Sequence, residues 1–142
     1  MASRLNPYLS FQGNAREAME FYRDVLGGEL TLTTFGEGGM SQEPGVADKI
    51  MLAQLETPSG YTLMGSDAAN ETHDVVGSGV QISLSGDPSA DAELSGYFAK
   101  LLEGAGTEIE PLVTAPWGDK FGMLTDRFGI MWMVNISGNQ QG

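Results

Sequence analysis

Few side chains in this sequence have the chemistry of a catalytic or metal-binding centre. His73 is the only histidine and there is no cysteine, which excludes a two-histidine metal site within one chain, a thiolate nucleophile and a cysteine-ligated metal. His73 lies in the polar stretch 70–74, without an apolar period, and an exposed linker histidine is favoured over a general base or a lone metal ligand. No Ser/His/Asp set, phosphate loop or pair of inward-facing carboxylates is visible, so no catalytic residue is predicted.

Two acidic positions are weaker candidates. Asp119 and Lys120 are adjacent and would form an ion pair or an acid–base pair, although solvated hairpin charges are commoner. Asp67 follows a predicted strand, where it would either reach the mouth of a binding site or serve in a turn.

Aromatic and methionine side chains are better suited to binding. Trp117 lies in a loop flanked by Gly and Pro, where it would either cover a pocket and stack on a planar ligand or anchor the loop on a sheet. Met64, Met131 and Met133 would line an adaptable apolar cavity or fill the core. Trp132 alternates with the last two methionines, which predicts that Trp132 packs in the core.

The composition narrows the class of protein. The net charge of −12 comes from 19 acidic and 7 basic residues, which disfavours nucleic acid and anionic membranes as partners. No apolar run is long enough for a membrane span, and no signal-peptide core is present. The absence of cysteine fits a cytoplasmic location. We therefore expect an acidic cytoplasmic protein without a nucleic-acid or membrane partner. The small-molecule ligand that we expect follows from the groove predicted below.

The sequence contains an internal repeat. Leu9–Asn14 reads LSFQGN and Ile82–Asp87 reads ISLSGD, and a helical pattern follows each copy. Each half closes with a turn glycine and an apolar run, at Gly60–Met64 and Gly129–Met133. Such self-similarity predicts two βαβββ modules. The expected fold is α+β, with a curved mixed sheet, helices outside and a central groove for a ligand.

The modules have predicted boundaries within a single domain, 1–142. Module one covers 5–66, a linker covers 67–78 and module two covers 79–137. Alternation and turn residues predict the strands: 5–12, 29–35, 49–56, 61–65, 80–85, 108–114, 120–125 and 130–136. The loop over 36–47 is long enough to act as a lid.

Each module has one predicted helix. Asn14 is expected to cap the first, with Glu17 as its capping-box partner, and Gly27 to end it. Asp87 is expected to cap the second, which would begin at Pro88 and end at Gly104. The apolar faces should lie inward: Ala15, Ala18, Met19, Tyr22, Val25 and Leu26 in the first helix, and Leu94, Tyr97, Phe98, Leu101 and Leu102 in the second.

This order of elements resembles the vicinal oxygen chelate superfamily, the glyoxalase/bleomycin-resistance/dioxygenase fold, in its PhnB-like branch. The resemblance covers nearly the whole chain and rests on several motifs in order: Pro7–Phe11, Phe21–Tyr22, Leu26–Gly27, Leu63–Asp67, Pro116–Gly122 and Thr125–Trp132. It implies the double-module fold, and it also implies a homodimer, since members commonly pair.

The resemblance also implies where a metal would bind. Metal-dependent members place His and Glu ligands on the first and last strand of each module. Here those positions correspond to Tyr8, Met64, Gln81 and Met133, with Gln81 and Ser83 as repeat twins of Tyr8 and Ser10. A phenol, an amide and two thioethers suit Zn²⁺, Mg²⁺, Mn²⁺ and Ni²⁺ poorly. No metal and no cofactor are expected.

The first hypothesis is therefore a metal-free protein that binds or sequesters a mostly apolar, planar, uncharged or cationic molecule. The alternative is a metal-dependent lyase, isomerase, transferase or dioxygenase of the same superfamily, and whether any reaction is catalysed stays open. A third possibility is a scaffold with a filled groove. The predicted ligand-binding residues point away from the helices or lie at the groove end: Tyr8, Ser10, Phe35, Met64, Gln81, Ser83, Trp117, Phe121 and Met133.

Overall fold

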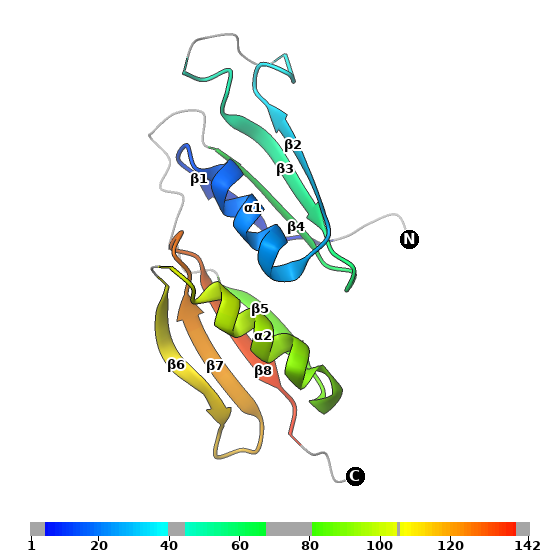
Figure 1. The fold of residues 1–142 in the computed structure, drawn as a ribbon, viewed down its shortest axis with the longest axis vertical. Coiled ribbons are helices and arrows are strands. Elements are labelled where there is room, and N and C mark those ends of the chain that lie inside the picture. Colours follow the sequence, from blue (N-terminus) through cyan, green and yellow to red (C-terminus); the bar gives the residue numbers. More distant parts are fainter. Residues whose placement is uncertain (1–4, 40–44, 68–80, 105, 139–142) are drawn as a thin grey trace. The chain divides into compact units, whose positions relative to one another are not determined.

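The computed structural model describes residues 5–39, 45–67, 81–104 and 106–138. The chain divides into two compact units, Met1–Ser78 and Gly79–Gly142 (Figure 1), which we call unit 1 and unit 2. Each unit is a four-stranded mixed sheet with one α-helix packed on it. The predicted α+β fold with two βαβββ modules is confirmed. His73 and most of the predicted linker lie outside the described residues.

Unit 1 contains β1 (Tyr8–Phe11), α1 (Ala15–Leu26), β2 (Glu29–Thr34), β3 (Ile50–Glu56) and β4 (Thr62–Asp67). The sheet order is β1-β4-β3-β2, with β1 parallel to β4 and the other pairs antiparallel. The predicted apolar face of α1 is buried in full. Burial of that face supplies the hydrophobic free energy that holds the helix on the sheet.

The turn from α1 into β2 depends on two glycines. Gly27 ends the helix with a φ of 80° and donates its N–H to the Arg23 carbonyl, as the sequence predicted. Gly28 follows with a φ of 108°, and a Cβ there would overlap the Glu56 carbonyl oxygen of β3. The close approach of this turn to β3 therefore requires glycine.

The prediction that Asn14 caps α1 is wrong. Asn14 occupies the N-cap position, but its side chain makes no capping hydrogen bond. Asp67, at the end of β4, caps the helix instead: Oδ1 accepts from Ala15 N at 2.9 Å and Gly13 N at 2.8 Å, and Oδ2 accepts from Ile50 N at 2.9 Å. Asp67 is only 3% exposed. This carboxylate therefore joins β4, the start of α1 and the start of β3, and does not reach a binding surface.

Unit 2 repeats the arrangement. It contains β5 (Ile82–Gly86), a 3₁₀ turn (Pro88–Ala90), α2 (Asp91–Leu101), β6 (Thr107–Thr114), β7 (Lys120–Thr125) and β8 (Met131–Ile136). The sheet order is β5-β8-β7-β6, with β5 parallel to β8. No helix among the described residues is long and apolar enough to cross a bilayer.

Two details of the second helix differ from prediction. Asp87 caps the 3₁₀ turn by accepting from Ser89 N, and α2 itself begins at Asp91. The buried residues of α2 are Leu94, Phe98 and Leu101, whereas Tyr97 and Leu102 are half-buried. The Tyr97 hydroxyl donates to Glu93 one turn earlier, so its polar end stays at the surface.

The two units close their last hairpins with different side chains on the same backbone turn. In unit 1 the Thr57 hydroxyl accepts from Tyr61 N at 3.0 Å. In unit 2 Asp126 accepts from Ile130 N at 3.1 Å and from Trp132 Nε1 at 2.9 Å. Trp132 is 1% exposed, and its predicted place in the core is confirmed.

Candidate ligand-binding faces

Each sheet has a face opposite its own helix, which we call its open face. In unit 1, Leu63 and Gly65 of β4 face α1, since a Cβ on Gly65 would lie 3.2 Å from Met19 Sδ. Side chains alternate along a strand, so Met64 and Ser66 lie on the open face. Tyr8 and Ser10 of β1 lie on the same side, because Phe11 is buried under the helix.

Strand register fixes a row of side chains across the open face of unit 1. Tyr8 is the cross-strand neighbour of Met64, Met64 of Gln54, and Gln54 of Thr31. The row is mostly polar. Asn6 Nδ2 lies 3.8 Å from Met64 Sδ, in position to donate. Next to this row, Glu56 accepts from Gln54 Nε2 and from Thr62 Oγ1.

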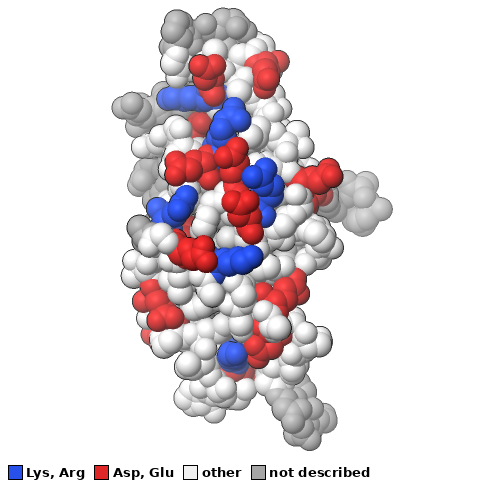
Figure 2. Space-filling model, in the orientation of Figure 1, with Lys and Arg blue, Asp and Glu red and all other residues white. Residues whose placement is uncertain are grey.

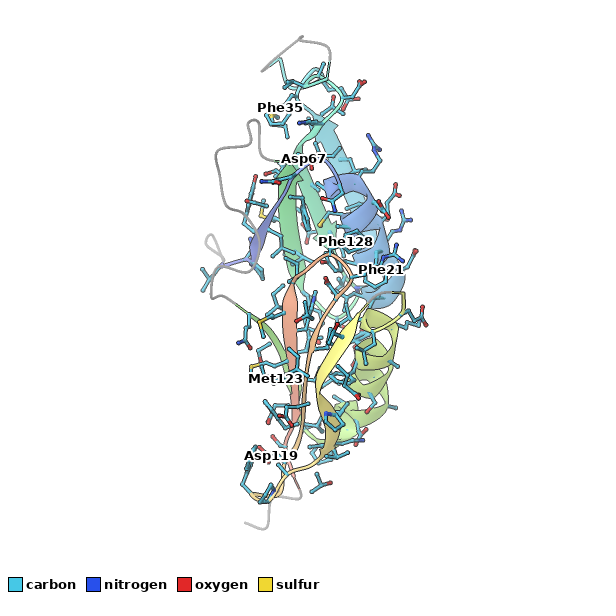
Figure 3. The ribbon with its side chains drawn as sticks, turned by 90° about the vertical axis from the view of Figure 1, so that its left-hand side faces the viewer. Phe21, Phe35, Asp67, Asp119, Met123 and Phe128 are labelled. Atoms are coloured by element: carbon cyan, nitrogen blue, oxygen red, sulfur yellow. The ribbon has the colours of Figure 1, made fainter. Side chains whose placement is uncertain are left out.

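The matching row of unit 2 is richer in thioethers. Ser83 is the neighbour of Met133, and Met133 of Met123. Gly122 and Leu124 face α2, as a Cβ on Gly122 would lie 2.9 Å from Phe98 Cε1. Met123 between them therefore points away from the helix (Figure 3). Met131 lies on the same side, two residues before Met133.

An aromatic pair extends this apolar surface. Phe121 is the cross-strand neighbour of Asn135 and of Val113. Trp117 lies in the turn before β7, with its ring centroid 6.1 Å from that of Phe121 and an interplanar angle of 59°. Trp117 is 65% exposed and Val113 is 56% exposed. The open face of unit 2 therefore presents aromatic, valine and methionine side chains to solvent.

Asp119 and Lys120 do not form an acid–base pair. Asp119 accepts from Gly138 N at 2.9 Å and from Asn135 Nδ2 at 3.2 Å, and these two donors hold the pKa of its carboxyl below the usual range. Lys120 Nζ lies 3.1 Å from Asp91 Oδ1 on α2. Both charges therefore have structural partners, one at the turn and one on the helix.

The structure brings some predicted site residues together and separates others. Tyr8 lies beside Met64, Ser83 beside Met133, and Trp117 beside Phe121. Ser10 pairs with Ser66 in the next row of unit 1. Phe35 lies beyond the end of β2, where its N–H donates to the Lys49 carbonyl, and it belongs to neither row.

The predicted equivalence of Gln81 with Tyr8 is wrong. Gln81 precedes β5, and the residue that lies beside Met133 is Ser83. Gln54 and Met123 are the third members of the two rows, and sequence reasoning missed both. The signal was available, because the predicted hairpin turns at 57–60 and 126–129 place residue 54 opposite 64 and residue 123 opposite 133.

The residues at the positions that the family resemblance assigns to metal ligands do not fit Zn²⁺ or Mg²⁺. After the register correction they are Tyr8, Met64, Ser83 and Met133, which provide no imidazole and no carboxylate. Mg²⁺ sites need carboxylate oxygens, and Zn²⁺ sites need imidazole, carboxylate or the cysteine thiolate that this sequence lacks. Within the described ranges, no three His, Cys, Asp or Glu side chains are grouped as a metal site.

The helix side of unit 1 carries charges of both signs. Figure 2 shows acidic and basic side chains interspersed over α1, where the sequence supplies Arg16, Glu17, Glu20, Arg23 and Asp24. Within the part of this face that is described, Lys and Arg do not gather into one patch. The face therefore gives no phosphate backbone a continuous positive surface.

Comparison with known proteins identifies the family. Residues 4–134 match the model of the Glyoxalase/Bleomycin resistance protein/Dioxygenase superfamily. The chain belongs to this superfamily. Protein YjdN of Escherichia coli K12 is 30% identical over 148 aligned positions, which cover 93% of this chain and 94% of YjdN.

Solved structures of two similar proteins have the same fold. Protein PA1353 from Pseudomonas aeruginosa has 41% sequence identity and a TM-score of 0.78, covering 97% of this chain and 100% of PA1353. The PhnB protein from Bacillus cereus has 23% identity and a TM-score of 0.74, covering 95% and 100% of the two chains. At that identity the second likeness concerns the fold alone.

Proposed function

We propose that this superfamily member binds a small, mostly apolar, planar molecule, uncharged or cationic, without a metal. The observation that carries the proposal is the open face of unit 2, where the exposed Trp117 and the half-buried Phe121, Met123 and Met133 form one apolar surface. Aromatic and thioether side chains accommodate planar ligands of varied outline. The net charge of −12 disfavours an anionic ligand.

The open face of unit 1 has a different part in this proposal. Tyr8, Ser10 and Gln54 supply hydroxyl and amide groups, and Glu56 supplies a carboxylate. A few polar groups of this kind would orient a ligand bound on the face of unit 1 itself. Met64 lies among them as the one thioether of the row. Phe35 and Gln81 remain proposed contacts outside the rows.

A metal-dependent lyase, isomerase, transferase or dioxygenase is the less favoured alternative. Those activities need a metal centre, and the side chains at the positions that hold it elsewhere in the superfamily are unsuited to one. Elemental analysis of protein purified without a histidine tag tests this point. We expect no stoichiometric Zn, Ni, Mn or Fe. One equivalent per chain that only a chelator removes would overturn the metal-free assignment.

We further propose a PhnB-like homodimer that acts in the cytoplasm. The sequence motifs around Pro7–Phe11 and Pro116–Gly122 support the branch. Exposed edge strands and a small core favour pairing of two copies. Light scattering at micromolar concentration should give the mass of two chains. A single-chain mass would contradict the dimer.

Dye binding tests the ligand class directly. Nile red is planar and uncharged, thioflavin T is planar and cationic, and anilinonaphthalene sulfonate is anionic. We expect the first two to bind and the third to bind more weakly, with the difference shrinking as salt screens the acidic field. Equal or tighter binding of the anion would refute this choice of ligand. Mass spectrometry of molecules that co-purify with the protein then identifies the natural ligand class.

Variants of Trp117 locate the site. Trp117→Ala should weaken Nile red binding by at least about fivefold, because an aromatic stacking contact contributes about 1 kcal/mol beyond its buried area. Trp117→Phe should recover most of the affinity. Tyr97→Ala on α2 is the control, since it removes an aromatic ring from the opposite side of the same sheet. A larger loss from Tyr97→Ala than from Trp117→Ala would place binding on the helix side instead.

A further inference from the structure

Three methionines lie together on the open face of unit 2. Met123 and Met133 are direct cross-strand neighbours on β7 and β8. Their Cβ atoms are therefore about 4.5–5.5 Å apart. Met131 is two residues from Met133 on the same side of β8 and pairs with Thr125. All three residues are half-buried, so each is partly accessible to solvent.

The other described methionines are Met19, Met51 and Met64, and Met51 is half-buried on β3 next to Gly38. Met19 is 0% exposed beneath α1. Met64 occupies the unit 1 position that corresponds to Met133, but its neighbours are Tyr8 and Gln54, and its sulfur lies 3.8 Å from the Asn6 amide nitrogen. A hydrogen bond to sulfur engages a lone pair that oxidation needs. The chain therefore holds a buried reference and a polar reference for the cluster.

A thioether reacts with a hydroperoxide without a metal or a base. The sulfur lone pair attacks the terminal peroxide oxygen, the S–O bond forms and the O–O bond breaks. The sulfur is oxidised to a sulfoxide, and the peroxide is reduced to water or an alcohol, which takes the transferred proton. Exposure of the sulfur sets the rate, and the product is polar and chiral.

We propose that Met123, Met131 and Met133 form a peroxide-sensitive modification site, and that sulfoxide formation there abolishes apolar binding by the open face of unit 2. The second part rests on the proposed function, and the first part does not. A sulfoxide oxygen in the Met123–Met133 pair places a strong hydrogen-bond acceptor in a surface suited to apolar contact, where an apolar ligand would leave it unpaired.

Peptide mapping by mass spectrometry tests the modification site. The full chain is treated with dilute hydrogen peroxide and sampled over time. We expect Met123, Met131 and Met133 to gain one oxygen at least about tenfold faster than Met19, with Met64 between them, since rate follows sulfur exposure. The proposed site would be overturned if all three methionines gained oxygen at rates no higher than that of Met19 or that of Met64.

Nile red binding, measured on the same samples, tests the consequence. Wild-type protein should lose binding in step with oxidation of the cluster, and methionine sulfoxide reductases of both epimer specificities should restore it. The triple variant Met123→Leu, Met131→Leu and Met133→Leu cannot be oxidised there, so its affinity after peroxide should equal its own affinity before treatment.

The outcomes separate the two claims. If the three methionines are oxidised rapidly and Nile red binding does not change, the proposed effect of oxidation on binding is wrong. The same would follow if peroxide abolished binding in the triple variant, because the relevant target would then lie elsewhere. Rapid oxidation in a protein that never binds the dye would contradict the proposed function and support the modification site alone.

Discussion

Replacement of Asp67 should destabilise unit 1 more than its single side chain suggests. In Asp67→Ala, three backbone N–H groups lose their acceptor, those of Gly13, Ala15 and Ile50. Gly13 N lies in a part-buried environment and can find water, whereas the other two donors are buried. Each buried donor left unsatisfied costs about 1–3 kcal/mol. The free energy of unfolding should therefore fall by about 3–5 kcal/mol, within the range given by two such donors.

Asp67→Asn provides an internal scale for this estimate. The amide oxygen can take the place of Oδ1 and keep the bonds from Gly13 and Ala15. The amide nitrogen then faces Ile50 N, so one buried donor loses its partner, and the expected loss is about 1–3 kcal/mol. Asp48→Ala is the matched control, because Asp48 is exposed. Its effect should stay within about 0.5 kcal/mol.

Urea unfolding followed by far-ultraviolet circular dichroism measures these differences, and amide hydrogen exchange at Ala15 and Ile50 localises them. If the Asp67→Ala variant does not fold, the Asp67→Asn variant still tests whether the loss of stability exceeds that of the Asp48→Ala control. The reasoning is refuted if Asp67→Ala lies within about 1 kcal/mol of wild type at unchanged slope, a loss smaller than one buried donor should cause. Unchanged exchange at both amides would refute it equally.

Three further predictions follow from local geometry. Gly28→Ala should lower the free energy of unfolding by more than about 2 kcal/mol in the same urea assay, because its Cβ would overlap the Glu56 carbonyl at positive φ. Gly96→Ala, at an open position in α2, should raise it by about 0.5–1 kcal/mol; a fall would contradict this. In an NMR titration, Asn135→Ala should raise the pKa of Asp119 but leave it depressed, since the larger cause, the Gly138 N–H, remains. The stability that comes from this lowered pKa is present above the pKa of the carboxyl in the unfolded chain and is lost as the pH falls through the pKa of the folded state. If the pKa of Asp119 is unchanged in Asn135→Ala, the hydrogen bond from Asn135 does not contribute to the shift.

The sequence predicted most elements of both units because their signals are local. The apolar face of α1 and the glycine after it define the helix, and the turns at 57–60 and 126–129 define the hairpins. The N-cap was mispredicted because the competing group is distant. Asp67 reaches the start of α1 from a strand more than fifty residues along the chain, and no local rule compares it with Asn14.

The register of the parallel strands also lay beyond the sequence pattern. The two repeat motifs align Gly13 with Gly86, yet Gly86 is a strand residue that pairs with Ile136, as Phe11 pairs with Asp67. The neighbours of a parallel strand lie far away in sequence, so a local motif cannot set its register. That difference moved the position beside Met133 from Gln81 to Ser83.

The placement of the two tryptophans determines which part of the chain tryptophan fluorescence reports on. Both belong to unit 2, one buried against Asp126 and one at the surface, and the sequence has no other. Tryptophan emission therefore responds chiefly to unit 2, and loss of structure in unit 1 would pass almost unseen. A melting curve recorded by emission alone would assign to the whole chain a stability that belongs to one half. Agreement between emission and circular dichroism curves would show that the halves unfold together.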